Sequence, residues 1–530
     1  MLLDSTIGVL AARQRRDLSV GFITDPEHRD KIMVTAGWHW IRNTVASNRM
    51  LVNRARPGVS YRQVERCFSQ SNSRLRKQLG SVMISFTVVA LLAACSGTAP
   101  TGVEGSAKAT SEPDLMVAPN AVWLSVGESA KLIAWLPSGE RSDDGASVFE
   151  WSTSDPAVVQ ISASGELKAV GRGTATISVS AEGPGRVGPY VRERATSVTV
   201  TDEAQEALIY KILGIPASVA ETWPSLAYTA EYDSVFAKWG EHHWERGAGV
   251  WERTYYDRGL AWYAAWARTG DAKYLERGHT DVTAYRDDYV LKNDGAATPK
   301  WVFPEGLAIH YILTGDSVSA LAVAKMADAM VRFKWLDTMT DPDFRWVDGR
   351  TQGRAVLVQL IAYLIDAPPI RDWKYETDRG IQAILDWHTM NGDNGAWKMA
   401  SYCGGQAHFQ VSHALLEVLI RYYDLVDPRQ EIPPVVKKSL DYIWQDWNPD
   451  ARAFAYMDIE CEGVGTTEPA TDLDLLMVWP FGWYYKWSGD DLYRQHGDEV
   501  FEGGLAVTWW SGTKQFNQSF MRSYRYPFYR

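Results

Sequence analysis

The chain has 530 residues, which exceeds the length of one ordinary domain, so we expect two or three folded units. Its net charge of -11 offers no basic surface for a phosphate backbone, which argues against a nucleic-acid partner. The 24 tryptophans are unusually many. Their rings can fill a core or stack on sugars, so we expect most in the core and some at a binding surface.

Near the amino terminus, an apolar run from Val82 to Ala94 follows Arg74, Arg76 and Lys77. The run is too short to cross a membrane as a helix. With its end, Leu92-Ala93-Ala94-Cys95, it resembles a bacterial lipoprotein signal. The resemblance implies cleavage before Cys95 and lipidation of its thiol. It therefore implies an exported protein, anchored through lipid in the bacterial cell envelope, at the outer membrane or cell surface.

This signal lies far from residue 1, which points to a misassigned start codon or a long precursor. We therefore interpret residues 1–94 as an upstream segment and signal peptide, and the small, polar residues 95–115 as a tether. The mature chain then keeps only Cys403 and Cys461. Because an exported protein meets an oxidising compartment, we expect these two cysteines to form a disulfide.

Residues 116–202 show the two-residue hydrophobic alternation of short strands, which predicts an all-β sandwich. Several motifs resemble the group-2 bacterial immunoglobulin-like domain. They are Val126-Gly127-Glu128, Trp151-Ser152-x-Ser154-Asp155, Ser164-Gly165 and Gly173-Thr174-Ala175-Thr176-Ile177. The resemblance implies a spacer or an adhesive unit without catalytic activity, and we expect a spacer.

Residues 205–530 are predicted to be helical, with helices that end in a Gly-Asp turn, as at Gly270, Gly315 and Gly489. Glycine can end a helix in the left-handed conformation, and aspartate can cap the next helix. Helices that are apolar all round alternate with amphipathic ones. The expected inner helices lie near 251–268, 305–314, 350–366, 407–426, 471–487 and 514–526. The expected outer helices lie near 229–245, 272–288, 316–335, 372–388, 433–446 and 490–503.

Six inner and six outer helices predict an all-α (α/α)6 toroid after the sandwich, with an open helical solenoid as the alternative. The arrangement resembles the toroids of many glycoside hydrolases and polysaccharide lyases. This resemblance is one of architecture, and no family-specific catalytic motif accompanies it. Function must therefore be argued from the site.

Aromatic and polar residues crowd the loops that enter the inner helices. Polar groups there are costly to bury unless they face a cavity, although a polar plug that ties the helices together is the alternative. We expect catalytic residues among Asp257, Glu305, Asp348, His408, His413 and Tyr256. We expect substrate-binding residues among Trp251, Arg258, Trp301, Trp346, Arg350, Arg354, Trp397, Gln406, Gln410 and Asp472.

Two reactions fit these residue types. A glycoside hydrolase needs two carboxylates, for which Asp257, Glu305, Asp348 and Asp472 are the candidates. A uronate lyase needs cations or amides that neutralise the sugar carboxylate, and a base for the C5 proton. Its candidate bases are Tyr255, Tyr256, His408 and His413, and its candidate neutralisers are Arg350, Arg354, Gln406 and Gln410.

The sequence therefore predicts an envelope lipoprotein that binds a polysaccharide and cleaves it, by hydrolysis or by elimination. The alternative is a surface protein without catalytic activity, used in adhesion or envelope assembly. We expect no cofactor and no metal site, because the pattern His-Glu-x-x-His is absent around Glu241-His242-His243.

Overall fold

The computed structural model describes residues 115–136, 141–144, 149–185, 188–215, 228–332 and 348–530. The predicted signal, Cys95, nearly all of the tether, and Trp346 lie outside these ranges. Within them, no helix combines the length and the apolar composition needed to cross a membrane.

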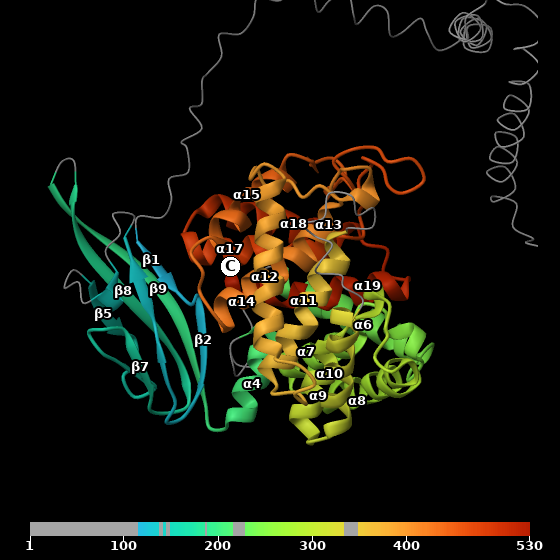
Figure 1. Ribbon diagram of the computed structural model, residues 1–530, viewed down its shortest axis with the longest axis horizontal. Helices are drawn as coiled ribbons and strands as arrows, with labels where there is room; N and C mark the ends of the chain where they lie inside the picture. Colours follow the sequence, from blue (N-terminus) through green and yellow to red (C-terminus); the bar gives the residue numbers. More distant parts are fainter. Residues whose placement is uncertain (1–114, 137–140, 145–148, 186–187, 216–227, 333–347) are drawn as a thin grey trace, which may run out of the picture. The chain divides into compact units, whose positions relative to one another are not determined.

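Strands dominate residues 116–201, as predicted (Figure 1). One sheet has the order β2-β9-β8-β5, a second has the order β3-β7-β6, and β1 pairs with β4. The bounds are β1 Met116–Ala118, β2 Ala121–Ser125, β3 Ser129–Lys131, β4 Ile133–Trp135, β5 Phe149–Thr153, β6 Val159–Ile161, β7 Glu166–Ala169, β8 Gly173–Gly185 and β9 Gly188–Thr201, with the short helix η1 Ser142–Asp144. Alternate residues of β8, Ala175, Ile177 and Val179, are buried in a core separate from that of the helices.

The rest of the chain is largely helical, and nearly fully buried helices alternate with amphipathic ones. The buried helices are α7 Arg258–Thr269, α9 Pro304–Thr314, α11 Gly349–Leu364, α13 His408–Gln410 with η8 Val411–Leu416 and α14 Glu417–Leu425, α16 Asp474–Met477 with α17 Trp479–Ser488, and α19 Thr513–Phe520 with η9 Ser523–Arg525 and α20 Tyr526–Tyr529. The amphipathic helices are α6 Thr229–Glu245, α8 Ala272–Tyr285, α10 Ser317–Arg332, α12 Trp373–Met390, α15 Ile432–Trp444 and α18 Asp491–Val507. Short elements lie between them: η2 Trp251–Thr254, η3 Arg286–Val290, η4 Leu291–Asn293, η5 Pro299–Trp301, η7 Ala400–Tyr402, β10 Trp447–Asn448 and β11 Ala453–Phe454.

The junctions between paired helices have the predicted geometry. Gly270, Gly315 and Gly489 end α7, α9 and α17 with φ of 69°, 71° and 71°. The aspartates that follow two of these glycines, Asp271 and Asp490, cap α8 and α18 with their side chains. Successive buried helices contact one another from α7 to α19, and α19 also contacts α7. The last buried helix therefore meets the first.

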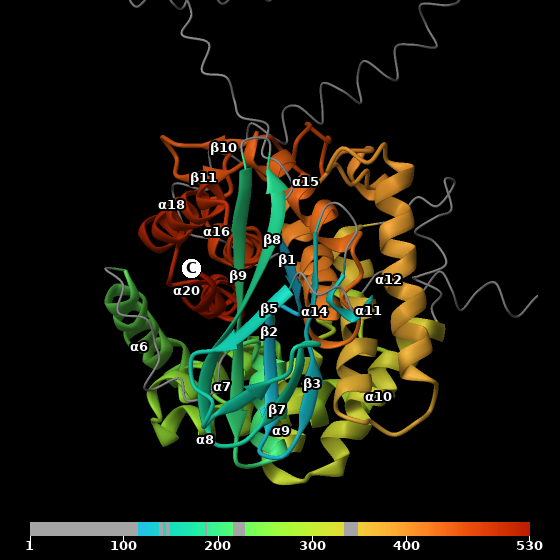
Figure 2. The same cartoon turned by 90° about the vertical axis from the view of Figure 1, so that its left-hand side faces the viewer.

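A further helix, α4 Ala204–Leu213, lies between the strands and the buried helices (Figure 1). Figure 2 shows the two long strands, β8 and β9, side by side. Helix α4 contacts β2 and β9 on one side and α9 on the other. The indole Nε1 of Trp123 in β2 donates to the carbonyl of Ile215, just after the helix, at 2.8 Å. Gly214 ends α4 with φ of 69°, and a Cβ there would lie 2.9 Å from Nε of Arg525. Only glycine fits this close approach.

The carboxyl end of α4 meets a group of charged side chains that we call the buried ion cluster: Glu305, Glu417, Arg421, Arg522 and Arg525. All five are at most 3% exposed. Arg522 Nη2 lies 2.8 Å from Glu305 Oε2, and Arg525 Nη1 lies 2.6 Å from Glu417 Oε1. Three guanidinium groups thus face two carboxylates.

The end of α4 balances the remaining positive charge of the buried ion cluster. Arg421 donates to the carbonyl of Ile212 at 3.0 Å, and Nε of Arg525 donates to the carbonyl of Leu213 at 2.7 Å. The carboxyl end of a helix carries about half a negative charge. The last turn of α4 therefore stabilises the cluster.

We predict that Glu417→Gln destabilises the whole protein by roughly 3–5 kcal/mol, because it leaves buried guanidinium groups without a counter-charge. Chemical and thermal unfolding of the full chain measure the change. The control is Glu502→Gln, at an exposed pair with Arg452, where less than about 1 kcal/mol is expected. An equal, small effect of both substitutions would contradict this role of the cluster.

Candidate functional site

The loops before α7 and the first turns of α11 and η8 bring five side chains together: Tyr255, Tyr256, Arg350, Arg354 and His413. We call them the Tyr–Arg cluster. The rings of Tyr255 and Tyr256 are 4.8 Å apart, and Tyr256 lies 5.9 Å from the ring of His413. The guanidinium carbon of Arg354 lies 5.0 Å from the ring of Tyr256. All five were candidates in the sequence, Tyr255 as a possible base of the elimination reaction only.

Two predicted tryptophans border this cluster. The ring of Trp301 lies 4.7 Å from that of Tyr255, and the ring of Trp251 lies 5.1 Å from that of Trp301. Trp251 also stacks on Tyr289 at 4.5 Å. Tyr255 and both tryptophans are half-buried, so each keeps part of its ring exposed. Such rings can stack on the apolar face of a sugar.

The loop that carries the two tyrosines is held in an unusual conformation. Tyr256 and Asp257 have φ of 66° and 45°, and residues other than glycine adopt such angles at some energetic cost, most often at functional sites. The buried Asn517 side chain donates to the carbonyl of Tyr255 at 2.7 Å. Asp257 caps α7 by accepting from the amide of Leu260 at 3.0 Å. These contacts hold the loop in place.

Arg350 and Arg354 bring positive charge to the cluster, and no carboxylate of the described residues forms an ion pair with either. Arg354 donates to the carbonyl of Lys300 at 2.5 Å, and burial lowers its pKa to about 10. Burial would lower the pKa of Arg350, but Tyr256, Tyr255 and nearby Asp348 raise it overall. Both side chains are therefore charged at neutral pH.

His413 supplies a neutral imidazole. Its Nδ1 donates to the carbonyl of Phe409, which leaves a lone pair on Nε2. Nε2 is buried and has no hydrogen-bond partner in the described part of the chain. Burial and the charge of Arg354 lower the pKa of His413 well below its ordinary value. The ring lies in the π-helical segment η8, and such segments are frequent at functional sites.

A second pair of tyrosines adjoins Arg350. Gln410 accepts from the amide of Arg350 at 3.1 Å and donates to the hydroxyl of Tyr402, so it connects the two. Tyr402 in turn lies beside Tyr456, and burial raises the pKa of both phenols. Tyr456 was not predicted, because it lies in an irregular segment after α15 and not at the start of a helix.

The structure gives the predicted carboxylates other partners. Glu305 belongs to the buried ion cluster, where Arg522, Arg421 and Arg525 outweigh burial and lower its pKa. This low pKa does not suit a proton donor in hydrolysis. The oxygens of Asp257 accept from the amides of Leu260 and Gly306, although burial and Glu305 raise its pKa to about 7. Both carboxylates therefore hold helices in place.

The two remaining carboxylates also have partners of their own. Asp348 caps α11 by accepting from the amide of Thr351 at 2.8 Å. Asp472 accepts from the side chain of Gln515 at 2.9 Å. Both carboxylates therefore accept hydrogen bonds from groups of the protein itself.

Four other predicted residues lie in the core, away from the Tyr–Arg cluster. Arg258 is fully buried against Asp281 at 2.6 Å. The indole of Trp397 is fully buried and donates to Ser439. The side chain of Gln406 accepts from the amide of Trp397 and lies 3.1 Å from Nδ1 of His408, whose Nε2 lies 2.8 Å from Asp446. Their polar groups bind other groups of the protein. This is the outcome expected if the polar residues tie the helices together and do not face a cavity.

The sulfur atoms of Cys403 and Cys461 are joined at 2.03 Å, with the Cα atoms 5.8 Å apart. Cys403 follows Tyr402 directly, and Cys461 lies in the irregular segment that also carries Tyr456. The bond therefore links the two segments that hold the second tyrosine pair. Within the described ranges, no group of three or more His, Cys, Asp or Glu side chains could hold a metal ion.

Comparison with known proteins identifies one part of the chain. Residues 114–184 match the bacterial Ig-like domain of group 2. No curated protein matches the sequence. Among solved structures, a polysaccharide lyase is similar, with a TM-score of 0.33 and 13% identity over 75% of this chain and 59% of that one. The chain thus spans less than two thirds of that lyase.

We predict that peptide mapping without reductant recovers Cys403 and Cys461 in one linked pair of peptides. Reduction should separate them, and material prepared under reducing conditions serves as the control. Free thiols at both positions in protein purified without reductant would contradict the bond.

Proposed function

We propose that the helical region is an (α/α)6 toroid that binds an acidic polysaccharide at the Tyr–Arg cluster and cleaves it by β-elimination. The observation that carries this proposal is the pair Arg350 and Arg354, which lie beside tyrosines and a neutral histidine without a described carboxylate partner. The toroid is supported by the contact between α19 and α7, which an open solenoid would lack.

The arginines suit the first requirement of elimination, which is to neutralise a sugar carboxylate. A uronate has its carboxylate on C5, next to the proton that must be removed. Planar guanidinium groups bind carboxylates well, and they stabilise the negative charge that develops when this proton leaves. A neutral sugar would leave both charges without a partner. We therefore infer a uronate, and not a neutral hexose, as the substrate unit.

Tyr255 is the base that we favour, because it is half-exposed whereas Tyr256 and His413 are at most 1% exposed. In the proposed step the Tyr255 phenolate takes the C5 proton. The electron pair left on C5 forms the C4=C5 double bond as the C4–O4 bond breaks. The Tyr255 hydroxyl then returns the proton to the departing O4. Trp251 and Trp301 would stack on neighbouring sugars.

Hydrolysis has less support, because Asp257, Glu305 and Asp348 cap helices or pair with arginines. We further propose that the protein is exported and anchored through lipid at Cys95. The immunoglobulin-like domain would then lie between the lipid and the toroid along the chain. A surface protein that binds glycans without cleaving them is the alternative function.

We predict that the full chain releases unsaturated oligosaccharides, seen as new ultraviolet absorbance, from at least one member of a panel of uronate polysaccharides. Arg354→Met and Arg350→Met should each lower kcat by about 10²–10³-fold, because each removes transition-state charge stabilisation. Arg246→Met, at an exposed arginine, is the control and should retain full activity. Thermal unfolding checks that the variants fold.

Two results would contradict this proposal. New reducing ends without unsaturated products would indicate hydrolysis. Binding of glycans without any product would favour the surface protein.

We predict that kcat/KM rises as the pH is raised from 7 toward the pKa of Arg354, about 10, above which Arg354 loses its charge. Burial and neighbouring Tyr256 raise the pKa of Tyr255 more than Arg354 and Arg350 lower it, so the phenolate is scarce at pH 7 and increases as pH rises. Tyr255→Phe should abolish this rise together with most activity. A profile that is flat above pH 7, or an active Tyr255→Phe variant, would exclude Tyr255 as the base.

A further inference from the structure

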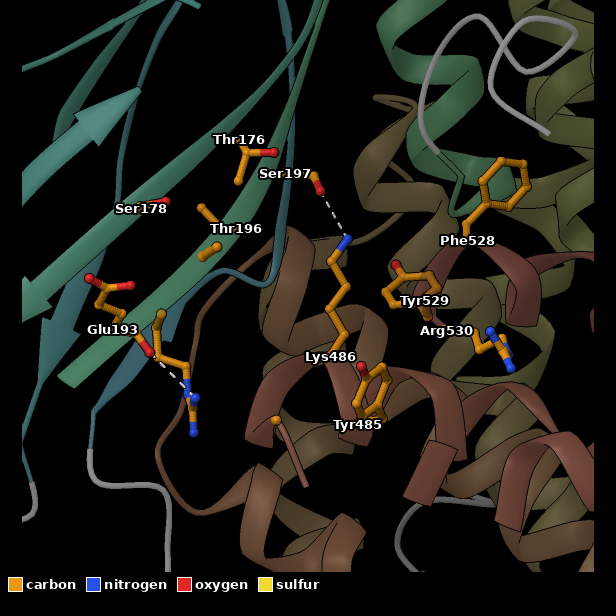
Figure 3. A pocket seen from close by; sticks show the side chains of 13 residues that line it. Thr176, Ser178, Glu193, Thr196, Ser197, Tyr485, Lys486, Phe528, Tyr529 and Arg530 are labelled. Carbon is orange, nitrogen blue, oxygen red and sulfur yellow. Dashed lines mark hydrogen bonds between the residues drawn. The ribbon is translucent and has the colours of Figure 1, made fainter. Parts of the chain in front are cut away.

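A pocket that contains none of the Tyr–Arg cluster residues lies where the long strands face the helices (Figure 3). It is lined by β8 and β9 on one side, and by the last turns of α17 and residues 528–530 on the other. Its volume is about 460 Å³. Pockets for small molecules span roughly 300–1,000 Å³, so this volume suits a small ligand.

The strand side of the pocket is a row of small polar side chains. Thr176 and Ser178 of β8 alternate with the buried Ile177, so both project from the outer face of the sheet. In the register of the two strands, Thr176 lies opposite Ser197 and Ser178 lies opposite Ala195. Small residues at four adjoining positions leave room for a ligand, and three of them offer hydroxyl groups.

The helix side of the pocket carries an ammonium group. Lys486 projects from α17 toward the strands, and its Nζ donates to the hydroxyl of Ser197 at 3.0 Å (Figure 3). An ammonium group has three donors, so two are left. Burial lowers the pKa of Lys486 to about 8, which keeps most of these groups charged at pH 7. No carboxylate of the described residues lies within ion-pair distance of Nζ.

The charge around Lys486 favours an anion. Arg194 and Arg530 also line the pocket, with Glu193 as the one acidic lining residue, and Arg530 is paired with Asp498 at 2.6 Å. The nearest buried carboxylate behind Lys486 is Asp424, whose pKa burial raises to about 7. It accepts from the indole of Trp483 at 2.9 Å and offsets only part of the positive charge.

We propose that this pocket is a second, non-catalytic binding site that takes one acidic sugar unit of the polysaccharide. Lys486 would bind its carboxylate, and the hydroxyls of Thr176, Ser178 and Ser197 would bind its hydroxyl groups. The half-buried ring of Tyr485 adds an apolar surface on the helix side. The sugar class rests on the proposed function, whereas the site itself rests on the pocket.

The pocket gives the immunoglobulin-like domain a role beyond that of a spacer. Its strands supply half of the lining, so the site exists only where the two folded regions meet. A glycan chain held here would stay close to the protein while another part of it reaches the Tyr–Arg cluster. Two weak sites on one polymer bind it more tightly than either does alone.

The test is a titration of the full chain with sodium glucuronate, followed by ligand-observed NMR. It is carried out in an Arg354→Met background, which weakens uronate binding at the Tyr–Arg cluster and so isolates the pocket. Within this background, Lys486→Met should weaken glucuronate binding at least tenfold. Ser178→Met, which fills the pocket and keeps the ammonium group, should do the same. Lys238→Met, at an exposed lysine of α6, is the matched control and should change nothing.

Unchanged glucuronate affinity in both Lys486→Met and Ser178→Met would overturn the proposal, and so would equally tight binding of glucose. These outcomes are independent of cleavage. If the chain releases no unsaturated products, the proposed activity fails, yet glucuronate binding that depends on Lys486 would still establish the pocket.

Discussion

The helical region depends on the buried ion cluster, in which three arginines meet two glutamates at the centre of the packed helices. Desolvating five charges is costly, and the cost is met only when every charge has a partner. Here the partners come from α9, α14 and the end of the chain, and from the backbone carbonyls at the end of α4. Helix α4 follows the strands directly and also packs on them. The packing of the immunoglobulin-like domain is therefore coupled to the charge balance of the buried ion cluster.

The neighbouring Tyr–Arg cluster differs from the buried ion cluster in the partners of its arginines. In the buried ion cluster each guanidinium has a carboxylate and the charges nearly cancel. Arg354 is about as well shielded from water and Arg350 is half-buried. Among the described residues, tyrosines, a neutral imidazole and backbone carbonyls surround them, and Asp348 lies near Arg350 without pairing with it. A protein that pairs its other buried arginines so thoroughly leaves these two with capacity for an anion. Lys486 differs from the paired arginines in the same way, because its ammonium group donates to a hydroxyl and not to a carboxylate.

Much of the fold could be predicted from the sequence, because its signals are local. Strand alternation and the Gly-Asp turns at Gly270, Gly315 and Gly489 depend on neighbouring residues only. The functional site was harder to predict from the sequence, because residue type and loop position do not reveal what a side chain faces. Glu305 and Arg258 are as polar as Arg354, yet partners more than 20 residues away in sequence hold them in the core. Tyr456 had no periodic pattern to indicate it.

We propose that the Tyr–Arg cluster breaks a glycosidic bond by elimination. The decisive measurement is mass spectrometry of the products from a defined uronate oligosaccharide. Elimination adds no water, so the masses of the two products must sum to the mass of the substrate, with the unsaturated unit on one of them. Products whose masses sum to the substrate plus one water would show hydrolysis and exclude elimination.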